Sequence, residues 1–151
     1  MAVNVINRQK HVKISGAALA RLLEKTIAEE LGRSADMNVL ITDDEEIARL
    51  NKQYLGHDGP TDVLAFGMDE EDGSLLGDVA VSAETATRVG PQHDNSPRRE
   101  LTLYAVHGTL HLLGYDDIKK ADRRKMWARQ DEIMSGVSGE AKKGEKKESG
   151  C

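Results

Sequence analysis

The 151-residue sequence contains a single cysteine, Cys151, at its last position. An internal disulfide is therefore impossible, and a zinc site built from several cysteines is excluded. Unbroken apolar runs do not exceed four residues. Runs of this length are too short for a membrane-spanning helix or the apolar stretch of a signal peptide. We therefore expect a soluble, cytoplasmic protein with no membrane partner.

Aromatic side chains and net positive charge are also scarce. Phe, Trp and Tyr together make up 3% of the residues, which argues against a platform that stacks several nucleic-acid bases. The chain has 21 Lys and Arg against 26 Asp and Glu, a formal net charge of −5. Proteins that coat nucleic acid nonspecifically need a positive surplus to displace counterions. The composition excludes that class but leaves local binding of nucleic acid open.

The spacing of apolar residues predicts short strands alternating with helices. We expect strands near residues 3–7, 37–42, 61–66 and 75–82, and helices near 15–31, 43–54, 83–89, 96–114 and 118–134. A charged turn at 69–73 joins the last two strands, which predicts an antiparallel pair. These elements indicate one α+β domain over residues 1–135. Residues 136–151 are rich in Lys and Glu and predict a disordered charged tail.

Charge is unevenly distributed along the chain. Residues 36–84 hold thirteen acids and two bases, whereas residues 98–129 hold eight bases and four acids. The basic segment has two interpretations, a solvated helix face or a surface that faces phosphates.

Two of the five histidines, His107 and His111, lie four residues apart on a predicted helix. This spacing places both imidazoles on one helix face. Gly114 allows the chain to turn, and Asp117 follows three residues later. Two nitrogens and a carboxylate with an open fourth position are typical of a catalytic zinc site. The alternatives are two ordinary half-buried histidines, and a capping role for Asp116 or Asp117 in the next helix.

The pattern is close to the zinc-protease motif H-E-x-x-H-x-x-G-x-x-H but lacks its glutamate. Gly108 occupies that position, and the glutamate is the general base that activates water for attack on a peptide bond. A standard peptidase is therefore disfavoured. Metal-bound water needs no side-chain base, so we assign no catalytic side chain and expect hydrolysis of another bond, such as a phosphodiester.

Three sequence blocks together resemble the YbeY family of endoribonucleases, the rRNA maturation factors. Residues 107–117 are HGTLHLLGYDD and fit ten of eleven positions of the family pattern H-G-x-L-H-L-x-G-Y-D-H. Residues 50–54 and 60–66 resemble L-N-x-x-[YFW]-R and P-T-D-V-L-S-F, and residues 76–82 resemble L-G-D-I-x-I-S. The blocks and their spacing extend over residues 3–134, which is the whole predicted domain.

The resemblance implies a zincin-like α+β domain with a small mixed sheet and a metal site at the end of a central helix. It implies a zinc-dependent, single-strand-specific endoribonuclease in 16S rRNA 3′-end maturation and late ribosome quality control, with the small ribosomal subunit as partner. His107 and His111 match the first two zinc ligands, and Asp117 matches the third. An assembly factor with little or no catalysis is the alternative function.

Three positions depart from the family pattern. Asp117 replaces a histidine and adds a negative charge, which favours a harder metal. Leu55 replaces an arginine implied to bind phosphate, so that role passes to Arg98, Arg99 or Lys119, or is lost. Ala65 replaces a serine.

Overall fold

The computed structural model describes residues 2–67 and 74–137. Every helix and strand expected from the sequence is present, and one short 3₁₀ helix is added. In chain order the elements are β1 (Val3–Asn7), α1 (Gly16–Leu31), β2 (Asp36–Thr42), α2 (Asp44–Leu55), β3 (Val63–Gly67), β4 (Leu75–Ser82), α3 (Ala83–Val89), η1 (Gly90–His93), α4 (Pro97–Leu112) and α5 (Lys120–Met134).

The four strands form one mixed sheet in the order β1-β2-β4-β3. β2 pairs in parallel with both β1 and β4. β3 and β4 are antiparallel, which confirms the expected strand pair. The arrangement is the α+β fold with a small mixed sheet that the sequence predicts. Among the described residues, no helix is both long and apolar enough to cross a membrane.

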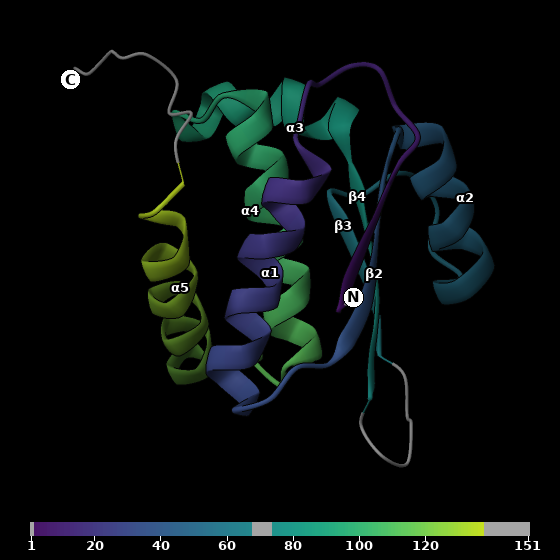
Figure 1. Cartoon of the computed structure of the whole chain (residues 1–151). Helices are drawn as coiled ribbons and strands as arrows, with labels where there is room; N and C mark the ends of the chain where they lie inside the picture. The colour runs from purple at the N-terminus through teal and green to yellow at the C-terminus, as the bar shows by residue number, and fades with distance from the viewer. Residues whose placement is uncertain (1, 68–73, 138–151) are drawn as a thin grey trace.

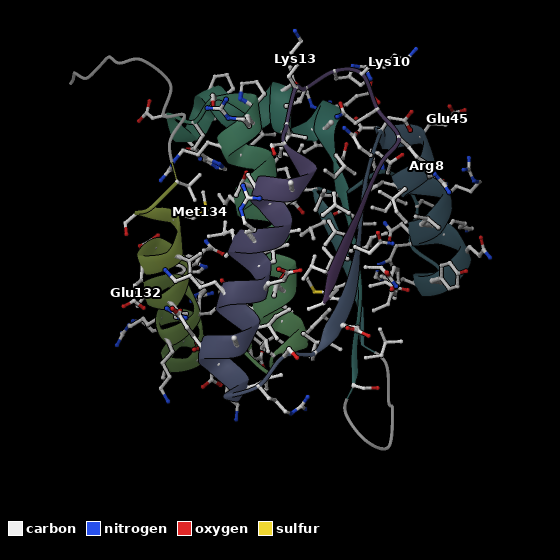
Figure 2. The ribbon with its side chains drawn as sticks, viewed as in Figure 1. Arg8, Lys10, Lys13, Glu45, Glu132 and Met134 are labelled. Carbon is white, nitrogen blue, oxygen red and sulfur yellow. The ribbon has the colours of Figure 1, made fainter. Side chains whose placement is uncertain are left out.

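Helices cover both faces of the sheet. α1 and α4 lie on one face and α2 lies on the other (Figure 1). Successive side chains of β4 point to opposite faces of the sheet. Val79 and Val81 belong to the larger core with α1 and α4, and Ala80 belongs to a smaller cluster with Ile47 of α2. Side chains fill the space between the sheet and the helices on either side (Figure 2). α4 thus lies at the centre of the larger core.

Local signals explain where several helices begin and end. The Ser15 side chain accepts a hydrogen bond from the Ala18 amide, and the Asp43 side chain accepts one from the Glu46 amide. Both are typical N-caps, which satisfy amides that lack a partner within the helix. Ser96 caps α4 in the same way, and Pro97 follows at the first turn, where a proline costs no hydrogen bond.

Two segments differ from the sequence expectation. The helix expected to end at Gly90 and Pro91 continues as η1, whose end at Asp94 has a positive φ of 59°. Val137, assigned by sequence to the tail, is partly buried against the core. The charged turn at 69–73 and the tail at 138–151 lie outside the described residues.

α4 lies close to the sheet at Gly108. A Cβ atom at this position would lie 2.8 Å from Cγ1 of Val79 and 3.0 Å from Cγ2 of Val63. Real Cβ contacts essentially never fall below 3.0 Å, so any side chain here would force α4 or the two valine side chains to move. The glutamate of the protease motif therefore has no room at position 108.

We predict that Gly108→Ala destabilises the protein although alanine favours helices. Overpacking costs about 1–3 kcal/mol, and the gain in helix propensity offsets about 1 kcal/mol of it. Urea unfolding should show a lower midpoint. The control is Gly16→Ala, since a Cβ there would meet Val5 at an ordinary 3.5 Å and should leave the midpoint unchanged or higher. A Gly108→Ala protein as stable as the parent would contradict the steric account.

Candidate metal centre

His107 and His111 lie one turn apart on α4 and direct their imidazoles to the same place. Their Nε2 atoms are 3.2 Å apart, and the ring centroids are 4.7 Å apart at an interplanar angle of 81°. Both side chains are partly exposed. The i, i+4 spacing therefore produces the pair of converging nitrogens that the sequence predicts.

A turn after α4 brings a carboxylate to the two imidazoles. Gly114 has a φ of +103°, a conformation that side chains rarely adopt, and it allows the chain to reverse. Oδ2 of Asp117 then lies 3.7 Å from Nε2 of His107 and 3.5 Å from Nε2 of His111. The neighbouring Asp116 instead accepts a hydrogen bond from the Ile118 amide.

Neither aspartate caps the helix that follows. α5 has Lys119 at its N-cap position, with no capping hydrogen bond from a side chain. The capping role left open for Asp116 or Asp117 is therefore wrong, and Asp117 faces the histidines.

The three side chains have the dimensions of a metal site. His107, His111 and Asp117 each offer one ligand atom, and these atoms all lie within 4.8 Å of one another. Tetrahedral zinc with bonds of about 2.0–2.1 Å places neighbouring ligand atoms about 3.4 Å apart. The closest separations here are 3.2, 3.5 and 3.7 Å, so the group fits a divalent ion with little rearrangement.

Gln130 of α5 orients the first histidine. Nδ1 of His107 lies 2.9 Å from Oε1 of Gln130. An amide oxygen can only accept, so this contact places the proton on Nδ1 and leaves Nε2 free to bind a metal. Sequence reasoning missed Gln130, because it lies 23 residues from His107 and only the packing of α4 on α5 brings them together.

Tyr115 fixes the turn that carries Asp117. Its hydroxyl donates to Oε1 of Glu30 in α1 at 3.0 Å, and its ring packs against the core. Burial, followed by the interaction with Glu30, raises the pKa of Tyr115. The hydroxyl therefore keeps its proton and remains a donor. Tyr115 is thus a partly buried residue that connects the turn to α1 and the core.

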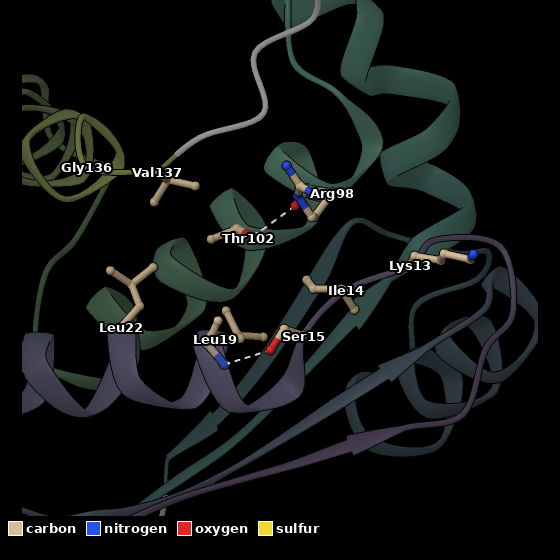
Figure 3. Close-up of a pocket in the computed structure, with 10 residues that line it drawn as sticks. Lys13, Ile14, Ser15, Leu19, Leu22, Arg98, Thr102, Gly136 and Val137 are labelled. Carbon is tan, nitrogen blue, oxygen red and sulfur yellow. Dashed lines mark hydrogen bonds between the residues drawn. The ribbon is translucent and has the colours of Figure 1, made fainter.

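The sequence predicts Arg98, Arg99 and Lys119 as phosphate contacts. Lys119 is close to the metal-binding group in sequence, two residues after Asp117. Arg98 and Arg99 begin α4, about 13 Å along the helix axis from His107. Arg98 lines a cavity of about 610 Å³ with Lys13 and Val137, at the opposite end of α4 (Figure 3).

The Arg99 guanidinium is engaged within the protein. It donates to the backbone oxygens of Met134 at 2.9 Å and Val137 at 3.3 Å, and to Oδ1 of Asn95 at 2.6 Å. It thus holds the C-terminal end of α5 against the start of α4. These contacts make Arg99 a structural clamp in this conformation.

Glu100 is fully buried near Arg99, and the sequence does not identify it as a site residue. Glu100 has no exposed surface, and its oxygens contact Nδ1 of His93 and Nδ2 of Asn95, both at 2.8 Å. These two contacts connect η1 and the loop after it to the first turn of α4. A glutamate in a first helical turn normally complements the helix dipole at the surface, so no sequence signal reveals its burial.

Leu55, which stands where the resemblance implies an arginine, lies away from the metal-binding group. It ends α2, on the sheet face opposite α4 (Figure 1), and is 48% exposed.

Comparisons with known proteins agree on one family. A family model described as endoribonuclease YbeY matches residues 4–138. An endoribonuclease YbeY from Syntrophotalea carbinolica is 37% identical over 142 residues, covering 89% of this chain and 95% of the relative. One from Oceanobacillus iheyensis is 41% identical over 128 residues, covering 77% and 83%. A Thermotoga maritima protein solved in solution superimposes with a TM-score of 0.61 at 29% identity, covering 88% and 87%.

Because Arg99 holds α5 in place, we predict that Arg99→Ala lowers stability. Loss of its hydrogen bonds should reduce the free energy of unfolding by about 1–3 kcal/mol. Arg98→Ala is the matched control, since its guanidinium has no hydrogen bond or ion pair with a described residue, and should change stability by less than about 0.5 kcal/mol. Urea unfolding measures both, and equal midpoints for the two variants would contradict the clamp.

Proposed function

The chain belongs to the endoribonuclease YbeY family, and we propose that it is a metal-dependent endoribonuclease that cleaves single-stranded RNA. The observation that carries the proposal is the convergence of His107, His111 and Asp117 at separations suited to a divalent ion. We further propose zinc as that ion, 16S rRNA 3′-end maturation and late ribosome quality control as the process, the small ribosomal subunit as partner and the cytoplasm as location.

Each residue of the proposed site has a distinct task. His107 and His111 hold the ion through Nε2, and Asp117 holds it through a carboxylate oxygen. A divalent ion in this position supplies Lewis-acid stabilisation for the negative charge that develops on a phosphodiester during cleavage. Gln130 fixes the tautomer of His107 and so keeps its Nε2 unprotonated. Gly108 leaves no side chain in the position of a protease base, which favours cleavage of a bond other than a peptide.

A ribosome assembly factor with weak or no catalysis is the second candidate function. Two observations favour it. Asp117 brings a negative charge to the ligand set, and Leu55 removes a cation from the position where the resemblance implies phosphate binding. Binding to small ribosomal subunits without metal-dependent RNA cleavage would favour this candidate over the nuclease.

We predict that His111→Ala abolishes both metal binding and RNA cleavage. The purified protein should contain about one divalent ion per chain, and the variant should contain almost none, because two protein ligands rarely retain zinc. Elemental analysis after dialysis measures metal content, and a single-stranded RNA cleavage assay with and without chelator measures activity.

The control for His111→Ala is His57→Ala, which removes an imidazole from a loop outside the metal-binding group. It should keep both metal and activity. Full metal content in the His111→Ala protein would overturn the ligand assignment. Cleavage that persists in that variant would show that the activity comes from a contaminant.

We also predict that Asp117→His shifts metal preference toward zinc. Replacing a carboxylate oxygen with an imidazole nitrogen removes a hard ligand and a negative charge. The ratio of zinc to manganese affinity should rise on the order of tenfold, measured by competition with a chelating dye. Asp116→His is the matched control, because Asp116 faces the Ile118 amide, and an equal shift in both variants would argue against ligation by Asp117.

A further inference from the structure

The only tryptophan in the chain, Trp127, lies in the middle of α5 with 52% of its surface exposed. The guanidinium carbon of Arg123 lies 5.7 Å from the centre of the indole ring. This distance is within the range of a cation–π interaction. The structure therefore presents a flat apolar surface to solvent with a cation beside it.

The packing of α5 on α4 brings this tryptophan level with the metal-binding group. The two helices run antiparallel, since Arg99 contacts Met134 while His107 contacts Gln130. Continuing the same pairing by one turn places His111 opposite the turn of α5 that contains Trp127.

Trp127 also lies on the side of α5 that adjoins the ligands. The opposite side is marked by Arg129, whose guanidinium pairs with Glu29 and Glu30 of α1 at 2.8 and 2.7 Å. The ligand side is marked by Gln130, which contacts His107. Trp127 precedes Gln130 by three residues and Arg123 precedes Trp127 by four, so the three form one strip on the helix surface.

The N-terminal half of α5 and the residue before it are strongly basic. In the described part of the chain, none of these basic side chains forms an ion pair; they are Lys119, Lys120, Arg123, Arg124 and Lys125. Ala121 and Asp122 are the two other residues in this stretch, and Asp122 is its one acid. Unpaired cations next to an exposed aromatic ring are complementary to a polyanion that carries aromatic bases.

We propose that Trp127 and Arg123 form a stacking subsite for one unpaired base of an RNA strand that lies along α5 beside the metal-binding group. The proposal rests on the proposed function and specifies how its substrate is held. The exposed part of the indole is available to a base, and Arg123 can contact the adjacent phosphate. Paired bases are already stacked within a duplex, so the subsite selects single strands. A single stacking site is compatible with the low aromatic content of the sequence.

Intrinsic fluorescence gives a direct test, because all tryptophan emission comes from position 127. The intact, metal-loaded protein is titrated with a single-stranded 2′-O-methyl oligoribonucleotide, which resists cleavage. We expect saturable quenching of the emission. An oligonucleotide of equal length with abasic sites keeps the phosphates but removes the bases, and it should quench little and bind more weakly.

Variants measured by anisotropy of a labelled oligonucleotide separate stacking from general attraction. Trp127→Ala should weaken binding by about 5- to 150-fold, the range for loss of one stacked base. Trp127→Phe retains an aromatic face and should stay within a few-fold of the parent. Tyr54→Ala, a change at an exposed aromatic on the opposite sheet face, should leave binding unchanged.

Failure of the subsite and failure of the proposed function give different results. If the parent protein cleaves RNA in a metal-dependent manner and Trp127→Ala has the same affinity and KM, the subsite is wrong and the nuclease assignment stands. Equal affinity for abasic and normal strands also overturns the subsite. If the parent neither binds nor cleaves single-stranded RNA, both proposals are wrong. Circular dichroism and thermal unfolding verify that each variant is folded.

Discussion

The close approach of α4 to the sheet at Gly108 is the constraint on which the arrangement of the metal-binding group depends. With no side chain at this position, the helix lies directly on Val63 of the edge strand β3 and Val79 of its antiparallel neighbour β4. Helical geometry then fixes the direction of the neighbouring side chains, because each residue is rotated by about 100° from the one before it. His107 and His111 fall on a partly exposed side of α4, where they can meet a loop and a second helix. A larger residue at 108 would strain the contact that holds His107 and His111 in this position.

Asp117 and Gln130 are brought to the histidines by segments that fold back against α4. The turn at Gly114 carries Asp117 back to the imidazoles, and Tyr115 anchors that turn to α1 through Glu30. α5 then runs back along α4 and places Gln130 against His107. Arg99 fixes the far end of α5 through the backbone of its last residues. A contact distant from the ligands thereby contributes to their orientation.

Much of this could be predicted from the sequence, and the limits have physical causes. Helices and strands follow from local spacing and caps, and the group of His107, His111 and Asp117 that could hold a metal follows from an i, i+4 pair, a glycine and a nearby acid. Sequence spacing contains no information on partners that only packing brings together, such as Gln130 with His107. For the same reason the sequence predicts Arg99 as a phosphate-binding cation, whereas its guanidinium donates to the backbone of Met134 and Val137 and to the Asn95 side chain. The burial of Glu100 likewise depends on η1, which extends a helix expected to end earlier.

The net charge of −5 conceals an uneven distribution of charge along the chain. Residues 36–84 hold thirteen acids and two bases, whereas five basic side chains that form no ion pair with a described residue lie between Lys119 and Lys125. Asp117 makes the candidate metal-binding group more negative than three neutral imidazoles would be. A polyanionic substrate would therefore be attracted less by the ion itself and more by α5. Under the proposed function, substrate affinity thus depends on the helix that also supplies Gln130, so that binding and ligand orientation share one element.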